Sequence, residues 1–201
     1  MRILLTGAGG FVGGSVICQA PTSWEIHAVV REKPSSVVNR VFWHLLDLRC
    51  RDAVDLLLER VKPDVIIHAA AAADIDWCEK NPSEARETNT ESTRYLTKYA
   101  KESGSRFIFL STDNVFDGAR GQYVEADVVN PVNYYGRTKV WAEHAIRESN
   151  CFYVIARVAL VVGLRLARWA LISQAAEPVR ATPIDSISVA TMLLTSPTVA
   201  S

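Results

Sequence analysis

The sequence predicts an α/β fold, a doubly wound parallel sheet with helices on both faces. Short apolar runs rich in β-branched residues recur along the chain, as expected of strands that are buried on both faces of a parallel sheet. Helical stretches separate several of these runs, so strands and helices alternate. The expected strands are Ile3–Leu5, Ile26–Val30, Val41–Leu46, Val65–Ile67, Phe107–Leu110 and Phe152–Ile155. The expected helices are Phe11–Gln19, Arg51–Arg60, Pro82–Glu102 and Tyr135–Ser149.

Specific residues mark the ends of the third expected helix. Asn81 places a capping residue before Pro82 at the first helical position, and Gly104 follows the last helical turn. Residues 113–133 show no clear period, which predicts a long loop. Loops of that length in a compact domain are usually functional.

Size and charge restrict the class of protein. The 201-residue chain is long enough for one well-buried domain with a small appendage. Apolar residues make up 49% and charged residues 22%, which argues against intrinsic disorder. The 22 basic and 22 acidic residues balance, so no global field attracts nucleic acid or an anionic membrane. We therefore expect neither partner.

The cysteines and the first residues indicate the cellular location. The four cysteines form no CxxC pair and have no histidine at metal-ligand spacing, which predicts no metal site and no disulfide. The N-terminal apolar run is similar to a secretory signal, but glycines at positions 7, 9, 10, 13 and 14 interrupt it. A membrane span needs about 20 apolar residues without such interruptions, and the sequence contains none. The prediction is a soluble, cytoplasmic protein.

A glycine-rich turn directly follows the first expected strand. Gly7, Gly10 and Gly13 stand three residues apart, with Phe11 and Val12 at the start of the next helix. In a dinucleotide-binding fold the first glycine permits the tight turn, the second lets the backbone approach the pyrophosphate, and the third allows close helix packing. The helix N-terminus then meets the negative charge. A plain flexible turn is the alternative, but position and spacing favour a Rossmann-type nucleotide site.

The end of the second expected strand indicates which dinucleotide is bound. Where NAD-specific folds place an acid for the ribose hydroxyls, the chain reads Val30-Arg31-Glu32-Lys33. The Arg31 guanidinium suits a 2′-phosphate. If Arg31 and Lys33 are instead solvated loop charges, Glu32 is the acid that matters. NADP(H) is therefore favoured, and NAD(H) is the alternative.

The strongest constellation joins Thr112 to a tyrosine and a lysine. Tyr135 and Lys139 are four residues apart on an expected helix, so both side chains project from one face. The usual pKa of a tyrosine phenol is about 10. A neighbouring ammonium lowers this pKa because it favours the phenolate, which brings Tyr135 nearer to the range of a proton shuttle. Thr112 ends the fifth strand, where its hydroxyl can bond a substrate oxygen. Such a pair alone is usually a surface coincidence, and Tyr134 competes for the role, although its partner four residues on is Thr138.

His68 and a run of alanines end the fourth expected strand. The apolar strand carries His68 inward, which favours a satisfied interior histidine over a catalytic base. Ala70, Ala71 and Ala72 can let the backbone lie flat against a cofactor, although small residues after a buried strand are also ordinary packing.

Five motifs occur in order along the chain: TGAGGFVG at 6–13, KPDVIIHAAA at 62–71, CEKNP at 78–82, STDNVFDG at 111–118 and NPVNYYGRTKVWAE at 130–143. From residue 1 to about Gly163 the chain thereby resembles the extended short-chain dehydrogenase/reductase family. Within that family it is most similar to dTDP-4-dehydrorhamnose reductases and to the related regulatory subunit of methionine adenosyltransferase.

The resemblance implies an NADPH-dependent reductase of a nucleotide-linked keto sugar. Hydride passes to the ketone carbon while Tyr135 gives its proton to the oxygen and Lys139 holds the ribose. The implied catalytic residues are Thr112, Tyr135 and Lys139, with Thr112 and Asp113 at the substrate. The implied cofactor residues are Gly7, Gly10, Phe11, Val12 and Gly13 at the pyrophosphate, Arg31 at a 2′-phosphate, Asp47 and Leu48 at the adenine, and Ala70, Ala71, Ala72, Tyr135 and Lys139 on the nicotinamide side.

Other functions remain open at this stage. Dehydratases that resemble this chain carry an acid where Asn114 follows Asp113, and an amide cannot supply the acid or base that water elimination requires. Reduction is therefore preferred. The alternatives are a non-catalytic, NADP-binding regulatory subunit that stabilises an interface with a partner enzyme, and an epimerase or dehydratase that retains its NAD. A homodimer is a further expectation.

The C-terminal part departs from the family pattern. After Arg157 the family usually shows Val-Tyr-Gly with aromatic neighbours, whereas residues 158–163 of this chain contain no aromatic side chain. Only 38 residues follow Gly163 (201 minus 163), where relatives carry a substrate lobe of roughly domain size. The expected division is a dinucleotide-binding domain at 1–163 and a remnant of the substrate-binding lobe at 164–201.

Overall fold

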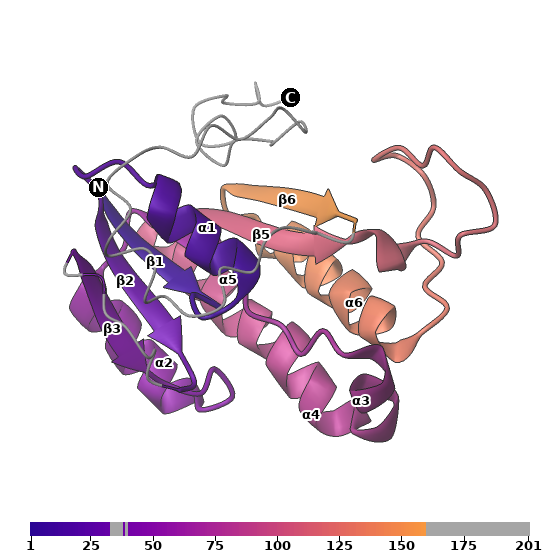
Figure 1. Cartoon of the computed structure of the whole chain (residues 1–201), viewed down its shortest axis with the longest axis horizontal. Coiled ribbons are helices and arrows are strands. Elements are labelled where there is room, and N and C mark those ends of the chain that lie inside the picture. The colour runs from indigo at the N-terminus through magenta and orange to yellow at the C-terminus, as the bar shows by residue number, and fades with distance from the viewer. Residues whose placement is uncertain (33–37, 39, 160–201) are drawn as a thin grey trace.

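The predicted doubly wound sheet is the centre of the structure. The computed structural model describes residues 1–32, 38 and 40–159. In this part of the chain the strands are β1 (Arg2–Thr6), β2 (Glu25–Val30), β3 (Val41–Leu45), β4 (Val65–His68), β5 (Arg106–Thr112) and β6 (Tyr153–Val158). They pair in parallel in the order β3-β2-β1-β4-β5-β6, that of a Rossmann sheet (Figure 1). The predicted fold class is confirmed.

Helices cover both faces of this sheet. They are α1 (Phe11–Gln19), α2 (Arg51–Val61), α3 (Ile75–Lys80), α4 (Pro82–Arg86), α5 (Ser92–Ser103) and α6 (Tyr134–Ser149) among the described residues. On one face Val16 and Ile17 of α1 pack against Ile3 and Leu5. On the other face α2, α5 and α6 pack against alternate strand residues such as Leu4. Because successive strand residues point to opposite faces and both faces are covered, the central strands β1 and β4 are buried along most of their length.

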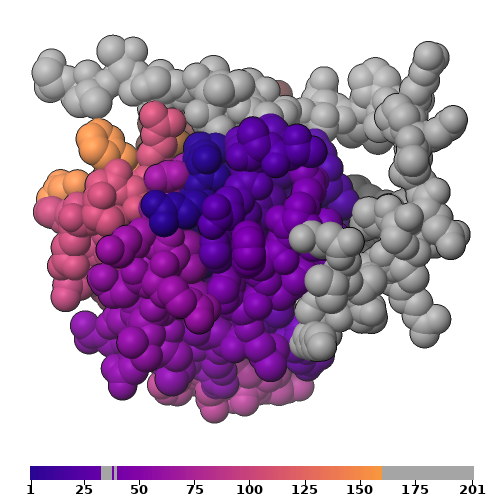
Figure 2. Space-filling model, turned by 90° about the vertical axis from the view of Figure 1, so that its left-hand side faces the viewer, coloured from indigo at the N-terminus to yellow at the C-terminus, as the bar shows by residue number. Residues whose placement is uncertain are grey.

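The side of the molecule at which β3 ends the sheet comes from the early part of the chain. Indigo and purple atoms of the N-terminal half form most of this face (Figure 2). The strand β3 has one strand neighbour, β2, and carries the exposed side chains of Phe42 and Leu45.

The expected single helix over Pro82–Glu102 is wrong in its middle. The helix α4 passes at Glu87–Glu91 into a π-helical turn, labelled η1, and α5 begins at Ser92. A π turn holds one more residue than an α turn, so it changes which side chain faces the interior. Here the buried residue at the centre of the turn is Asn89, whose amide contacts the segment after β4. The tertiary contact explains the widened turn.

Two short helices lie where no helix was expected. Asp74 caps α3 by accepting a hydrogen bond from the Trp77 backbone N–H at 2.9 Å. A 3-10 turn, labelled η2, spans Asp113–Val115 at the start of the expected long loop. Its N-cap is Thr112, whose hydroxyl accepts from the Asn114 N–H. Both helices begin with a polar cap directly after a strand or its extension.

The expected C-terminal remnant at 164–201 lies outside the described residues, as do Lys33 and Gly163. Among the residues that the structure describes, no helix is both long and apolar enough to cross a membrane.

Candidate active site at the carboxyl edge of the sheet

The residues predicted to form the site follow the carboxyl ends of neighbouring strands. In sheet order, Asp47 and Leu48 follow β3, Arg31 follows β2, the glycine turn follows β1, the alanine segment follows β4, and Thr112 ends β5. Adjacent strands are about 4.8 Å apart, so the row from β3 to β5 extends about 19 Å. This edge includes the switch point between β1 and β4, where doubly wound sheets bind ligands.

Backbone contacts explain two of the three glycines in the turn. Gly7 has φ +70°, and a Cβ there would lie 2.6 Å from the Ala69 carbonyl carbon. A Cβ on Gly13 would overlap the Gly7 carbonyl oxygen. Gly7 therefore brings the turn against the segment after β4, and Gly13 brings α1 against the turn. Gly10 is different, since it is exposed and its Cβ would meet only Gly7 O at 3.2 Å.

The N-terminus of α1 fits a phosphate group. Gly10 is its N-cap residue, no side chain among the described residues caps the helix, and the first turn holds no acid. The N–H groups of a first helical turn have no partner within the helix and favour negative charge. Phe11 is exposed and Val12 is half-buried at this end. A backbone without a Cβ at Gly10, next to free helical N–H groups, is what a pyrophosphate requires.

The carboxylate of Asp47, after β3, is paired with Arg49 and feels the charge of Arg31 after β2. Arg49 donates to both carboxylate oxygens of Asp47, with both Nε distances at 3.0 Å and the Nη2 distance at 2.6 Å. This pair lowers the pKa of Asp47, and the charge of Arg31 lowers it further. Arg31 therefore lies near Asp47 and is exposed, while Leu48 is buried in the core beneath. Arg49 was not among the expected site residues.

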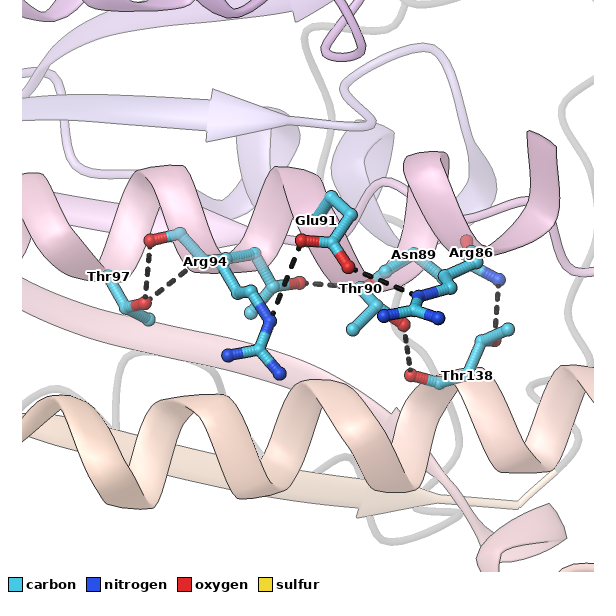
Figure 3. A network of polar contacts seen from close by, with 8 residues as sticks. Arg86, Asn89, Thr90, Glu91, Arg94, Thr97 and Thr138 are labelled. Atoms are coloured by element: carbon cyan, nitrogen blue, oxygen red, sulfur yellow. Dashed lines mark hydrogen bonds and ion pairs between the residues drawn. The ribbon is translucent and has the colours of Figure 1, made fainter. Parts of the chain in front are cut away.

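Asn89 holds the alanine segment from the side of η1. Its Oδ1 accepts from the Ala72 N–H at 2.7 Å, and its Nδ2 donates to the Ala72 carbonyl at 3.0 Å. The same Nδ2 reaches Thr138 Oγ1 in α6 at 2.9 Å, and Thr90 donates to the Thr138 carbonyl (Figure 3). The segment containing Ala70 and Ala72 is thereby fixed to the helix that carries Tyr135 and Lys139.

Thr112 and Tyr135 lie close to each other. Thr112 is 6% exposed at the end of β5, and Tyr135 is half-buried in the first turn of α6. Burial raises the pKa of the Tyr135 phenol, and a hydrogen bond with Thr112 opposes the rise. Negative charge at Asp113 and Cys78 would raise this pKa further, so both residues lie nearby. The phenol therefore stays protonated at neutral pH.

A chain of amide hydrogen bonds supports this pair. Asn133 caps α6 by accepting from the Gly136 N–H at 2.7 Å, and it donates to Asn114 Oδ1 at 3.1 Å. Asn114 in turn donates to Thr112 Oγ1 at 3.1 Å. A Cβ on Gly136 would overlap the Asn114 carbonyl oxygen and lie 2.9 Å from Pro131 Cβ. Apart from Asn114, whose amide only helped to distinguish reactions, these supporting residues were not predicted from the sequence.

Lys139 is buried and lies against β5. Its Nζ donates to the Leu110 carbonyl at 2.7 Å and sits 3.9 Å from the centroid of the Phe109 ring. Burial lowers the pKa of Lys139 to about 7, although Glu143 opposes this. The expectation that an ammonium lowers the pKa of Tyr135 is wrong for this structure, because burial of the phenol raises that pKa.

Glu143 is a buried carboxylate that the sequence analysis missed. It accepts from Ser111 Oγ at 2.6 Å, from Arg157 at 3.0 and 2.7 Å, and from Arg147 at 3.1 Å. These bonds hold its pKa below the ordinary value even though burial works the other way. Residues from β5, β6 and α6 are thereby joined one helical turn after Lys139.

A pocket of about 560 Å³ opens beside Asp113. Its walls include Asp117, Tyr123 and Glu125 from the long loop and Arg157 from β6. Asp117 accepts from Tyr123 Oη at 2.5 Å, and the Tyr123 ring stacks on Phe116. The expected functional loop therefore forms the wall of a pocket next to Thr112 and Asp113.

His68 is an interior histidine, as expected. It is fully buried, and both ring nitrogens have threonine partners. The described cysteines are all free thiols. In the described part of the chain, no three His, Cys, Asp or Glu side chains cluster as a metal site would require.

The parallel sheet, the glycine turn and the tyrosine-lysine helix together define a Rossmann-fold protein of the extended short-chain dehydrogenase/reductase class. Residues 1–185 match the family described as RmlD substrate binding domain, and the chain belongs to that family.

Two curated relatives show what the chain is similar to. Methionine adenosyltransferase 2 subunit beta of Bos taurus is 33% identical over 167 residues, which cover 81% of this chain and 47% of that protein. The probable low-salt glycan biosynthesis reductase Agl14 of Haloferax volcanii is 35% identical over 170 residues, 82% of this chain and 55% of that protein. The chain thus spans about half the length of these relatives.

Solved structures agree with this assignment. A hypothetical dTDP-4-dehydrorhamnose reductase from Sulfolobus tokodaii superposes with a TM-score of 0.71 at 33% identity, covering 79% of this chain and 56% of that one. The dTDP-4-dehydrorhamnose reductase from Bacillus anthracis, solved in complex with NADP, gives 0.70 at 28% identity, with coverage of 79% and 53%.

Proposed function

We propose that the protein binds NADP(H) and reduces the ketone of a nucleotide-linked sugar. The observation that carries this proposal is the contact between Thr112 and a protonated Tyr135 at the edge where the glycine turn ends. Relatives named as reductases and a similar structure solved with NADP support the reaction class and the cofactor.

The proposed cofactor contacts follow the carboxyl edge of the sheet. Gly7, Gly10, Phe11, Val12 and Gly13 hold the pyrophosphate, Asp47 and Leu48 border the adenine, Arg31 binds the 2′-phosphate, and Ala70, Ala71 and Ala72 line the path to the nicotinamide ribose. The uncapped N-terminus of α1 supports the first assignment. The pairing of Asp47 with Arg49 supports the assignment of Arg31 to the 2′-phosphate, because a neutralised carboxylate repels a phosphate less.

In the proposed reaction the bound dinucleotide supplies the hydride. Tyr135 gives its phenolic proton to the ketone oxygen. Thr112 donates its hydroxyl proton to Asp113 Oδ1 at 3.1 Å in the structure, and in the proposed reaction it turns this proton to the ketone oxygen. The raised pKa of Tyr135 suits this direction, since a phenol that stays protonated can act as the acid. Asp113 borders the substrate pocket.

Lys139 is the third proposed catalytic residue. Its amine must leave the Leu110 carbonyl to reach a ribose at the edge of the sheet. A pKa of about 7 means that this buried amine readily changes its protonation state, which suits a group that replaces the proton lost by Tyr135.

Loss of NADPH absorbance with a panel of nucleotide-linked 4-keto sugars tests this function. We expect Tyr135→Phe to lower turnover by about 10² to 10⁴ while leaving NADP(H) binding intact. The matched control is Tyr134→Phe, because the neighbouring Tyr134 ring packs edge-on against Trp141 instead. The proposal is contradicted if turnover does not depend on Tyr135, or if no keto sugar is turned over.

A second function is a non-catalytic, NADP-binding regulatory subunit. The 33% identity to an adenosyltransferase subunit favours it. So does the hydrogen bond of the Lys139 amine to the Leu110 carbonyl of β5, because an amine held there does not reach a ribose. Co-purification with a partner enzyme whose activity is unchanged by Tyr135→Phe would support this function. If no stable partner is found, the reductase is preferred.

We also propose that the protein is cytoplasmic, forms a homodimer, and binds neither nucleic acid nor membranes. The balanced charge of the chain supports the last two points. Light scattering of the purified chain tests the oligomeric state, and retention on anionic vesicles or DNA would contradict the rest.

A further inference from the structure

A continuous set of buried hydrogen bonds joins the two walls of the proposed cofactor crevice. The Ala70 N–H donates to Thr6 Oγ1 at 3.3 Å, and Thr6 Oγ1 lies 2.6 Å from His68 Nδ1. On the other side of the imidazole, His68 Nε2 lies 3.1 Å from Thr93 Oγ1. We call Thr6, His68, Thr93 and Asn89, with the backbone of Ala70 and Ala72, the polar ring.

The ring closes through η1. Thr93 donates its hydroxyl proton to the Asn89 carbonyl at 2.8 Å, and the Asn89 side chain bonds both backbone groups of Ala72. It therefore starts and ends on the segment after β4, two residues apart. Thr6, His68, Thr93 and Asn89 are each at most 1% exposed, so water does not compete for these bonds.

The bonds fix the tautomer of His68. The single proton of Thr93 goes to the Asn89 carbonyl, so Thr93 Oγ1 accepts from His68 Nε2. His68 Nδ1 is then the acceptor for the Thr6 hydroxyl. Burial and the nearby charge of Lys139 lower the pKa of His68 to about 3, so the imidazole is neutral near physiological pH. Each N–H and O–H proton named in the ring therefore has an acceptor, and Asn89 Nδ2 uses its second proton for Thr138.

The ring bonds act beside the strand pairing of β1 and β4, in which Thr6 and His68 are direct partners. Gly7 and Ala69 approach backbone to backbone with no side chain between them, as the 2.6 Å to a Cβ on Gly7 indicates. Besides the strand pairing, the bonds that link the walls are Ala69 N–H to Thr6 O at 3.3 Å and Ala70 N–H to Thr6 Oγ1 at 3.3 Å. Thr6 is in turn held by His68. Loss of one ring member thus removes one of the bonds that support the glycine turn and the alanine segment beyond the strand pairing.

We propose that His68 and Thr93 are positioning residues for the dinucleotide, which set the distance between the glycine turn and the alanine segment from beneath the crevice. The inference rests on the proposed function, because it assumes that a dinucleotide occupies the crevice. Neither side chain reaches the edge of the sheet, so both act through Thr6 and Ala70. Asn89 extends the effect to α6 through Thr138.

The test compares two buried threonines one turn apart on α5. Thr93→Val removes the hydroxyl that accepts from His68 but keeps the shape of the side chain. The control is Thr97→Val, since Thr97 is equally buried but donates to the Thr93 carbonyl, outside the ring. Thr93→Ser restores the hydroxyl. Calorimetric titration of the full chain with NADP⁺ gives Kd for each variant, and thermal unfolding without ligand gives stability.

We expect Thr93→Val to raise Kd for NADP⁺ by about three- to tenfold, the scale of one buried hydrogen bond. Thr97→Val should lower thermal stability but leave Kd within twofold, and Thr93→Ser should recover most of the affinity. Equal values of Kd for Thr93→Val and wild type would overturn the proposal while leaving the reductase intact. An equal rise in both valine variants would also overturn it, as a general packing effect. A wild-type chain that binds neither dinucleotide would contradict the proposed function itself.

Discussion

Lys139 and Glu143 are two fully buried charges one turn apart in α6, and their surroundings differ sharply. Glu143 is bonded by Ser111 and two arginines, whereas Lys139 has one carbonyl and a ring face. Paired carboxylates keep their charge in the interior, while an amine with few partners loses its proton easily. Lys139 therefore changes its pKa on folding, and this change can be measured through the pH dependence of stability.

The first prediction concerns stability against pH. The pKa of Lys139 is about 7 in the folded protein and about 10.4 when unfolded. Between these values the unfolded chain binds more protons at this site, so its contribution to the free energy of unfolding rises with pH. From pH 7 to 9 we expect about 2 kcal/mol from Lys139, lost in Lys139→Met. Urea unfolding across this range measures the difference.

The control for this prediction is Lys98→Met, since Lys98 is exposed on α5. Its pH profile should run parallel to that of the wild type. If the profile of Lys139→Met is also parallel, Lys139 remains charged in the folded protein and the premise is wrong.

The second prediction concerns Gly136. A methyl group there collides with the Asn114 carbonyl and with Pro131, both in the structure that supports Thr112. We expect Gly136→Ala to lower the free energy of unfolding by about 2 to 4 kcal/mol and to reduce turnover, because overpacking forces the backbone apart. Gly121→Ala is the matched control, since a Cβ there meets nothing within 4 Å. Chemical unfolding should separate the two variants, and equal stabilities would contradict the clash.

At the scale of elements, the sequence predicted what depends on local patterns. The bounds of α1 are those expected, because a glycine turn and a proline-free apolar stretch define them locally. The strand runs were recognised because both faces are buried. The π turn η1 was not, since it depends on Asn89 bonding Ala72, 17 residues away. No local spacing reports such a contact.

The site was predictable to the same extent. The closeness of Thr112 and Tyr135 was predictable, because strand ends and helix spacing indicate which residues lie together. Asn133 and Glu143 were missed because their roles depend on partners in other elements. The lowered pKa of Lys139 was not predicted, because the effect of burial on this pKa outweighs that of a neighbouring charge. A spacing of four residues does not show how deeply a side chain is buried.

The third prediction tests η1 as an element. Asn89→Ala leaves the Ala72 N–H and carbonyl without their side-chain partner, which costs about 1 to 3 kcal/mol for each buried group. We expect a loss of about 2 to 4 kcal/mol of stability and faster amide exchange of Ala72. Glu87→Ala, at an exposed position of the same turn, is the control. Unchanged exchange at Ala72 would contradict the role of Asn89.

At the scale of the whole molecule, the site belongs to one edge of one sheet. Each strand from β3 to β5 contributes at its carboxyl end, so a ligand along that edge contacts segments far apart in sequence. A ligand that binds the folded chain but not the unfolded chain therefore stabilises the entire sheet. The chain covers about half the length of its relatives, and this half holds all the proposed cofactor contacts.

The last prediction uses that coupling to distinguish NADP⁺ from NAD⁺. A ligand at about 100 times its Kd adds about 2.7 kcal/mol, which raises the melting temperature of a domain of this size by roughly 5 to 10 °C. Arg31 follows β2 and its charge acts on Asp47, so we propose that its guanidinium bonds a 2′-phosphate there. We expect Arg31→Ala to lose more than about half of the NADP⁺ increment and none of the NAD⁺ increment. Arg106→Ala, at the opposite edge of the sheet, should change neither. If Arg31→Ala lowers both increments alike, Arg31 does not select between the dinucleotides, and Glu32 becomes the residue that does.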